Sequence, residues 1–295
     1  MNNNRRHRSK FIVLLTAVLT WQVFTAVADA VSDRITVTVQ GHGPDVLLIP
    51  GLASSSAVWD ATAGHLENHF RLHIIQVAGF AGSPSHANAQ GPVLQPTVEA
   101  IDAYIKTNKL QTPKVIGHSL GGLMAEMLAI QHPEDVGGLM IVEALPFYGA
   151  LFGAKDTSAV APQAAAMRDS ILAQTQDDYA KSETAFVHML VKSPDGYKLA
   201  TKWAVASDKS VVARAMYEDM TTDIRPQLQK IKVPVTILHA WDALPGIPQA
   251  AADRLYEESY AALPNKKIVR IDDSFHFIML DQPDKFAAEV DKFLK

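Results

Sequence analysis

The sequence contains no cysteine, and this absence removes several classes of protein at once. Without thiols there is no disulfide framework, no thiolate nucleophile, no thiolate metal site and no lipoprotein anchor. The chain also has no low-complexity tract and no repeat of fixed period, which excludes disordered and solenoid architectures. What remains is a chain of 295 residues, 48% hydrophobic and 20% charged, which suits one globular domain with a large core.

The first 28 residues differ from the rest of the chain. Four basic residues lie between positions 5 and 10, an apolar run follows, and Ala26-Val27-Ala28 gives the small-x-small pattern of a cleavage site. This order predicts a signal peptide over residues 1–28 and a periplasmic or secreted protein. The alternative is an uncleaved membrane anchor, because an apolar run of about 18 residues approaches the spanning length.

Basic residues are the scarcer charged type. Removal of residues 1–28 takes away four basic residues and no acid, which leaves 23 basic and 31 acidic residues and a formal charge of −8. This balance disfavours nucleic acid as a partner. After cleavage of the signal we expect no stable membrane insertion.

The chain that follows alternates between strand and helix patterns. Two strand patterns separated by the turn "GHGP" predict an opening hairpin. Further buried strands and a helix follow in alternation, so we expect an α/β fold with a mostly parallel sheet covered by helices. The strands are expected at 34–40, 45–51, 70–77, 114–117 and 136–144, with helices at 97–108 and after residue 119.

The alternation stops at about residue 145 and resumes after about residue 224. Four helical patterns fill this interval, which predicts a helical cap inserted into one domain of residues 29–295. The pattern after the cap predicts strands at 233–240 and 266–272 and helices at 249–263 and 284–294.

Gly117-His118-Ser119-Leu120-Gly121 matches the G-x-S-x-G pattern. Glycines on both sides permit a tight turn from strand to helix, on which a serine side chain is held exposed. A buried strand before the motif and a helix after it supply the required context. The pattern therefore predicts that Ser119 is a nucleophile.

A serine nucleophile needs a base and an acid that orients the base. His276 follows the last expected strand, at the edge where loops of a parallel sheet gather, and is the predicted base. Asp242 follows the preceding strand and gives the chain order Ser, Asp, His, so it is the predicted acid. Glu143 is the alternative acid, because it also lies at the carboxyl end of a strand.

Five segments together resemble the α/β-hydrolase fold family, in its group of capped, serine-nucleophile esterases. The segments are "LLIPGL", "QVAGFAGSP", "VIGHSLGG", "KVPVTILHAWDALP" and "SFHFIMLDQPDKFAAEVDKFL". The resemblance covers the chain after the predicted signal and implies the triad Ser119, Asp242 and His276. It also implies an oxyanion hole formed by the backbone N–H groups of Leu52 and Leu120.

Two residues depart from the family pattern. Pro50 stands where the family usually has histidine, and Gln76 stands where it often has aspartate. Neither side chain would perform acyl transfer, since the oxyanion hole is made by backbone groups. Both departures bear on loop geometry and substrate.

These features predict an enzyme that hydrolyses carboxylic esters of small molecules through an acyl-enzyme, without a cofactor. Serine at position 119, rather than aspartate, disfavours dehalogenase and epoxide hydrolase chemistry. The alternatives are an amidase or aminopeptidase, a lactonase or a C–C bond hydrolase with the same triad, and a ligand-binding homologue without useful turnover. No metal site is predicted, because His65 and His69 lack the order of a metal motif and a third ligand.

Overall fold

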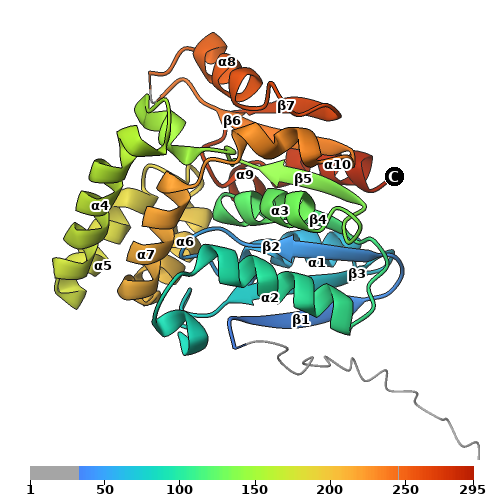
Figure 1. Cartoon of the computed structure of the whole chain (residues 1–295), viewed down its shortest axis with the longest axis horizontal. Coiled ribbons are helices and arrows are strands. Elements are labelled where there is room, and N and C mark those ends of the chain that lie inside the picture. The colour runs from blue at the N-terminus through green and yellow to red at the C-terminus, as the bar shows by residue number, and fades with distance from the viewer. Residues whose placement is uncertain (1–32, 245) are drawn as a thin grey trace, which may run out of the picture.

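A seven-stranded sheet forms the centre of the computed structural model, which describes residues 33–244 and 246–295 (Figure 1). The strands are β1 (Ile35–Gly41), β2 (Asp45–Ile49), β3 (Arg71–Val77), β4 (Lys114–His118), β5 (Gly138–Val142), β6 (Val235–Trp241) and β7 (Lys266–Asp272). Their spatial order is β1-β3-β2-β4-β5-β6-β7, and all neighbouring pairs except β1 and β3 are parallel. The carboxyl ends of six strands therefore meet at one edge of the sheet, where ligands of such folds bind.

The predicted opening hairpin is wrong. β1 pairs with β3, from Ile35 opposite Val77 to Gly41 opposite Arg71, and β2 lies on the other side of β3. The segment after β1 packs against the loop that precedes β3, and an added Cβ at Gly41 would lie 2.3 Å from the carbonyl oxygen of Phe70. The chain does turn between β1 and β2, but the two strands lie on opposite sides of β3 and do not pair with each other.

Helices cover both faces of the sheet. Their bounds are α1 (Asp60–Leu66), α2 (Leu94–Thr107), α3 (Leu120–Gln131), α8 (Gln249–Ser259), α9 (Ile278–Asp281) and α10 (Pro283–Leu294). α2 and α3 pack together on one face, while α1 and α10 contact each other on the opposite face (Figure 1). β4 and β5 are buried on both faces, which explains their continuous apolar sequences. The α/β class with a mostly parallel sheet is confirmed.

Four further helices lie between β5 and β6 in the chain: α4 (Thr157–Ala173), α5 (Gln176–Val187), α6 (Pro194–Ala206) and α7 (Lys209–Thr221). They gather beside one end of the sheet, and we call them the cap (Figure 1). α4 packs against α7, and a small core of Phe147, Val160, Ala164, Met216 and Met220 joins them. The cap lies within the interval 145–224 in which the strand pattern stops.

Four short 3-10 helices complete the fold, at Ser56–Trp59, His86–Ala89, Tyr148–Phe152 and Arg225–Lys230. Within residues 33–244 and 246–295, no helix is both long and apolar enough to cross a membrane. The predicted signal peptide over residues 1–28 lies outside the described residues.

Candidate active site

Ser119 lies between β4 and α3 in a backbone conformation that few side chains adopt, with φ 53° and ψ −125°. Its backbone N–H donates to the carbonyl of Val142 on the neighbouring strand (2.9 Å), and its carbonyl accepts from the N–H of Gly122 (2.7 Å). Such a conformation costs about 1–3 kcal/mol and persists only where the surroundings hold it. The structure therefore places Ser119 on the sharp, strained turn that the motif predicts.

Two glycines allow this turn to form close to β2. An added Cβ would lie 2.3 Å from the Gly121 carbonyl oxygen at Gly117, and 2.4 Å from the Ile49 carbonyl oxygen at Gly121. Both distances are too short for any side chain. The two glycines of the motif are required by packing, and they bring the start of α3 against the end of β2.

His276 lies in the loop between β7 and α9, and its Nδ1 is 3.2 Å from Oε2 of Glu143. The imidazole side chain is 20% exposed and the glutamate side chain 14%, so this pair is largely shielded from water. A carboxylate accepts only, so the Nδ1 of His276 carries the proton in this bond. The opposite nitrogen, Nε2, is then free to accept a proton from a nucleophile.

Glu143 is held from two sides as it meets His276. Its Oε1 accepts from the backbone N–H of Ala240 on β6 (2.6 Å) and from the hydroxyl of Tyr256 on α8 (3.0 Å). The residue directly follows β5 and has a positive φ of 49°. With Oε1 fixed, Oε2 is left for the imidazole. These contacts give Glu143 the fixed geometry that the acid of a triad would need.

The expectation for Asp242 is corrected by its contacts. Oδ2 of Asp242 lies 2.5 Å from the ammonium of Lys192, and Oδ1 accepts from the backbone N–H of Leu244 (2.8 Å). The Lys192 ammonium is the main reason that the pKa of Asp242 lies below its ordinary value. Asp242 follows β6, as predicted, but its carboxylate is bound to a lysine and not to His276.

His118 packs against His276 and hydrogen-bonds to its backbone carbonyl. Its ring is fully buried, with its centroid 4.7 Å from that of His276 and its Nε2 3.1 Å from the His276 carbonyl oxygen. Burial lowers the pKa of His118 well below its ordinary value, so the ring is neutral. A neutral ring with Nε2 facing a carbonyl oxygen carries its proton on Nε2, which leaves no role for His118 as the base.

Leu52 and Leu120 lie where the resemblance places an oxyanion hole. Leu120 is the first residue of α3, and the first backbone N–H groups of a helix have no acceptor within the helix. Leu52 lies in the loop after β2, and among the described residues neither of these two N–H groups has a protein acceptor. Both residues are positioned at the same edge of the sheet as Ser119. The two donors are available to a developing oxyanion.

Gln76 has a structural role that the sequence did not reveal. Its side-chain oxygen accepts from the backbone N–H of Ser56 (2.8 Å), and its amide nitrogen donates to the carbonyl oxygens of Val77 (3.1 Å) and Phe80 (3.2 Å). These bonds tie the loop after β2 to the loop after β3. A neutral amide, which both donates and accepts, suits this position better than a carboxylate, which only accepts.

One cavity of about 740 Å³ joins these groups beneath the cap. Ser119, Glu143 and His276 line it, and most of the remaining wall is apolar. Within the described residues Ser119 makes no hydrogen bond to His276; such bonds in free enzymes are often long and shorten when substrate binds. The volume falls in the range of pockets for small organic ligands.

Sequence reasoning did not single out several polar residues that line this cavity. Tyr256 comes from α8, while Tyr148, Glu183 and Asp219 line the cavity from the cap side. Nothing in the local pattern distinguishes them from residues that pack in a core or face solvent. The sequence pointed to Glu143 only through its position at the end of a strand, and Asp242 has the same kind of position.

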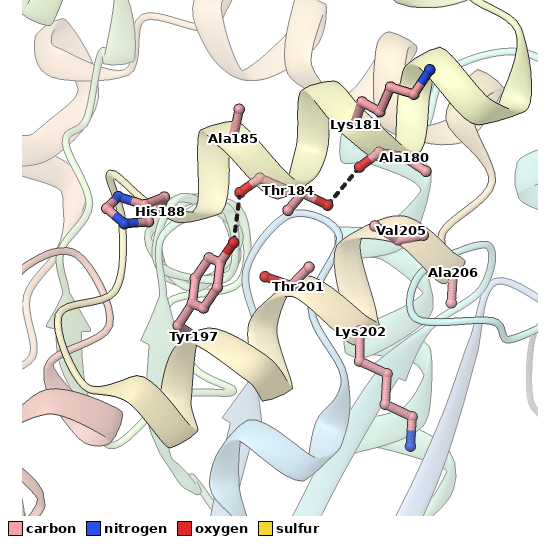
Figure 2. A pocket seen from close by; sticks show the side chains of 10 residues that line it. All are labelled: Ala180, Lys181, Thr184, Ala185, His188, Tyr197, Thr201, Lys202, Val205 and Ala206. Atoms are coloured by element: carbon pink, nitrogen blue, oxygen red, sulfur yellow. Dashed lines mark hydrogen bonds between the residues drawn. The ribbon is translucent and has the colours of Figure 1, made fainter.

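A second hollow lies between α5 and α6 and carries no candidate catalytic group. Figure 2 shows its lining, in which Lys181 and Lys202 point away from one another and Tyr197 reaches Thr184. The Tyr197 hydroxyl donates to the Thr184 backbone carbonyl at 3.4 Å. Its lining includes His188 but no serine and no carboxylate, so it does not present a set of triad residues.

One cluster could hold a metal ion by geometry. Ligand atoms of Asp102, His132 and Asp135 lie within 4.8 Å of one another. The ammonium of Lys106 lies 2.9 Å from Asp102 and 3.4 Å from Asp135, so a cation of the protein already pairs with both carboxylates. The cluster also lies where α2 and α3 end, at the opposite edge of the sheet from Ser119.

Comparison with known proteins agrees with the fold. Residues 46–289 match the alpha/beta hydrolase family, and the chain therefore belongs to that family. A pimeloyl-acyl-carrier-protein methyl ester esterase from Vibrio atlanticus is 26% identical over 271 residues, covering 89% of this chain and 98% of the relative. The corresponding esterase from Aromatoleum aromaticum is 27% identical over 264 residues, covering 85% and 98% of the two chains.

Solved structures share the fold at lower identity. An esterase from Exiguobacterium antarcticum superposes with a TM-score of 0.75 at 17% identity, covering 92% of this chain and 99% of its own. The enol-lactonase from Burkholderia xenovorans gives a TM-score of 0.74 at 19% identity, covering 91% and 99%.

Proposed function

We propose that this protein is a serine hydrolase that cleaves carboxylic esters through an acyl-enzyme. The observation that carries the proposal is one cavity that Ser119, at the start of α3, and the Glu143–His276 pair line together. Membership of the alpha/beta hydrolase family and full-length relatives that are named esterases support it.

In the first half of the reaction, Ser119 Oγ attacks the ester carbonyl while Nε2 of His276 accepts its proton. Glu143 stabilises the imidazolium, because its Oε2 already faces the protonated Nδ1. The backbone N–H groups of Leu52 and Leu120 bind the negative oxygen of the tetrahedral intermediate, and one such donor contributes roughly 3 kcal/mol to catalysis. His276 then protonates the departing alcohol.

In the second half, water replaces the alcohol. Nε2 of His276 accepts a proton from the water as it attacks the acyl group on Ser119, and the serine leaves with that proton. The free carboxylic acid is released and the enzyme returns to its starting state. The groups that perform both halves come from the protein.

The proposal is tested with p-nitrophenyl esters of increasing acyl length and the Ser119→Ala variant. We expect turnover by the mature protein and a loss of kcat of about ten-thousand-fold or more in the variant. Circular dichroism and thermal unfolding of Ser119→Ala control for folding. Residual activity near that of the parent in a folded variant would contradict the mechanism.

The alternatives appear as distinct outcomes of the same experiment. A protein that hydrolyses no ester but reacts with a fluorophosphonate at Ser119 would have an active serine and a different substrate, and amides, lactones and C–C substrates would be assayed next. A protein that neither turns over esters nor reacts with the fluorophosphonate would be a ligand-binding homologue.

We also propose that the chain is exported and loses residues 1–28. The support is the basic, apolar and small-residue order of this segment. Mass spectrometry of the protein from the soluble exported fraction should find Asp29 at the N-terminus. Recovery of the intact chain from membranes would favour the anchor instead.

A further inference from the structure

Among acidic, basic and histidine side chains, only carboxylates and histidines line the cavity. Among the described residues that line it, the carboxylates are Glu143, Glu183 and Asp219, and no lysine or arginine is present. The carboxylate of Glu143 already accepts hydrogen bonds from His276, Ala240 and Tyr256. The other two carboxylates belong to the cap, with Glu183 on α5 and Asp219 on α7. The cavity thus has negative charge that catalysis does not use.

Asp219 is the more unusual of the two. Its residue is only 7% exposed, yet among the described residues no donor hydrogen-bonds to its carboxylate and no cation pairs with it. A buried carboxylate without a partner is costly, and native proteins retain few such groups without a functional reason. Burial raises the pKa of Asp219 to about 7, and it raises the pKa of Glu183 to about 7 as well.

The position of Asp219 is fixed by its neighbours on α7. The carboxylate of Glu218 accepts from the backbone N–H groups of Val93 (3.0 Å) and Leu94 (2.6 Å) at the start of α2. One turn earlier, the guanidinium of Arg214 donates to the carbonyl oxygen of Asn88 (2.7 Å). These bonds anchor the outer side of α7 to the main domain. These bonds therefore oppose a movement of α7 that would expose Asp219 to solvent.

Tyr148 connects this carboxylate with the catalytic end of the cavity. The tyrosine lines the same cavity, and the charges of Asp219 and Glu143 both act on it. Burial, reinforced by these two charges, raises the pKa of Tyr148 to about 12, so its hydroxyl stays protonated. Asp219 and Glu143 are thus close enough to influence the same phenol within one cavity.

We propose that Asp219, with Glu183 as a second carboxylate on the cap wall of the same cavity, binds a protonated amine of the substrate. Resting on the proposed function, this makes the substrate an ester that carries an ammonium group separated from the carbonyl by an apolar chain. The ammonium supplies the hydrogen bonds and the positive charge that Asp219 lacks, and charge-assisted hydrogen bonds of this kind are the stronger ones. The apolar wall, which includes Leu145 and Met216, accommodates the chain between the two ends.

The test uses matched pairs of p-nitrophenyl esters, 6-aminohexanoate with heptanoate and 8-aminooctanoate with nonanoate. Each pair differs only by an ammonium in place of a methyl group. We expect the wild-type protein to have the higher kcat/KM for the ammonium ester of at least one pair. Asp219→Asn should lower that value about tenfold, which corresponds to about 1.4 kcal/mol, and change the neutral partner by no more than about twofold.

Two variants serve as references. Glu183→Gln should lower kcat/KM for the ammonium ester by a smaller factor, because Glu183 is less buried than Asp219. Asp177→Asn removes an exposed carboxylate of α5 that does not line the cavity, and should have no effect on either ester. Equal preference in wild type and Asp219→Asn, with neutral esters still hydrolysed, would overturn the amine site and leave the hydrolase intact.

If no ester is hydrolysed, the proposed function fails and the amine site is still tested by binding. Hexylammonium chloride should raise the melting temperature of the wild-type protein, relative to 1-hexanol at the same concentration, and this difference should vanish in Asp219→Asn. An identical shift in both proteins would overturn the amine site on its own.

Discussion

Two carboxylates of the same cavity have opposite surroundings. Glu143, at the end of β5, is bonded to a backbone N–H, a tyrosine hydroxyl and the imidazole of His276. Asp219, on α7 of the cap, is buried without a partner among the described residues. The first is preorganised, so its charge is ready to stabilise an imidazolium. The second has no such partner, and a bound ammonium would supply one. On the two proposals above, the reaction takes place at the sheet edge and the cap contributes to the choice of substrate.

The largest expected effect comes from removal of the charge on the partnered carboxylate. Glu143→Gln keeps the shape but favours the wrong tautomer of His276, and kcat should fall about 10³- to 10⁴-fold. Ester hydrolysis and thermal unfolding, measured on the same preparation, separate this effect from misfolding. A folded Glu143→Gln protein with wild-type kcat would remove Glu143 from the triad.

The unpartnered carboxylate should show its effect in stability. Burial holds the pKa of Asp219 at about 7 in the folded protein, above its ordinary value of 3.8. Between these values the folded state binds more protons than the unfolded state, so stability is lost as the pH rises from about 4 to about 7. Asn at this position has no proton to lose. The free energy of unfolding of Asp219→Asn should exceed that of the parent by on the order of a few kcal/mol at pH 8, and by much less near pH 4.

Urea unfolding at several pH values checks this prediction. Asp177→Asn is the matched control, because its carboxylate is exposed, and its difference from the parent should be small and independent of pH. An Asp219→Asn protein whose stability difference does not change with pH would show that the carboxylate is not destabilised in the empty cavity.

A smaller effect is expected at Tyr256, whose hydroxyl donates to Glu143 and is expected to position it. Tyr256→Phe removes one hydrogen bond to the carboxylate, and bonds of this type contribute about 1.5–3 kcal/mol. We expect kcat to fall roughly tenfold while KM stays unchanged. A rise in KM with constant kcat would mean that Tyr256 shapes the pocket and leaves Glu143 unaffected.

The smallest effect is expected at Asp242. Its carboxylate binds Lys192 and the N–H of Leu244, so Asp242→Asn should leave kcat within about threefold of the parent. Asp242→Asn is the matched control for Glu143→Gln, because each variant removes one carboxylate charge at the end of one of two neighbouring strands. A loss in Asp242→Asn as large as that in Glu143→Gln would return Asp242 to the triad.

The sequence predicted much of this fold, because hydrophobic patterns and turn residues within short segments indicate the strands and helices of an α/β fold. The buried runs at β4 and β5, the glycines around Ser119 and the interval of the cap all follow from short-range sequence features. The pairing of β1 with β3 did not follow, because a turn motif indicates a reversal of the chain and says nothing about which strand becomes the neighbour.

The sequence favoured Asp242 over Glu143 as the acid, and it lacked the contacts that distinguish them for a similar reason. Glu143 and Asp242 both follow parallel strands, so the fold brings both to the same edge. What separates them is a tyrosine from α8 that fixes one carboxylate and a lysine 50 residues before Asp242 that binds the other. Contacts between segments so far apart in the chain have no local signature. The buried Asp219 is equally invisible, because its burial depends on how the cap packs.

The most direct test of the central claim is the proton NMR signal of the Nδ1–H of His276, which a hydrogen bond to a carboxylate moves far downfield. We predict that the signal is present in the wild-type protein and in Asp242→Asn, and absent or moved upfield in Glu143→Gln. A signal that survives in Glu143→Gln and disappears in Asp242→Asn would show that the imidazole is oriented by Asp242, and would contradict the account.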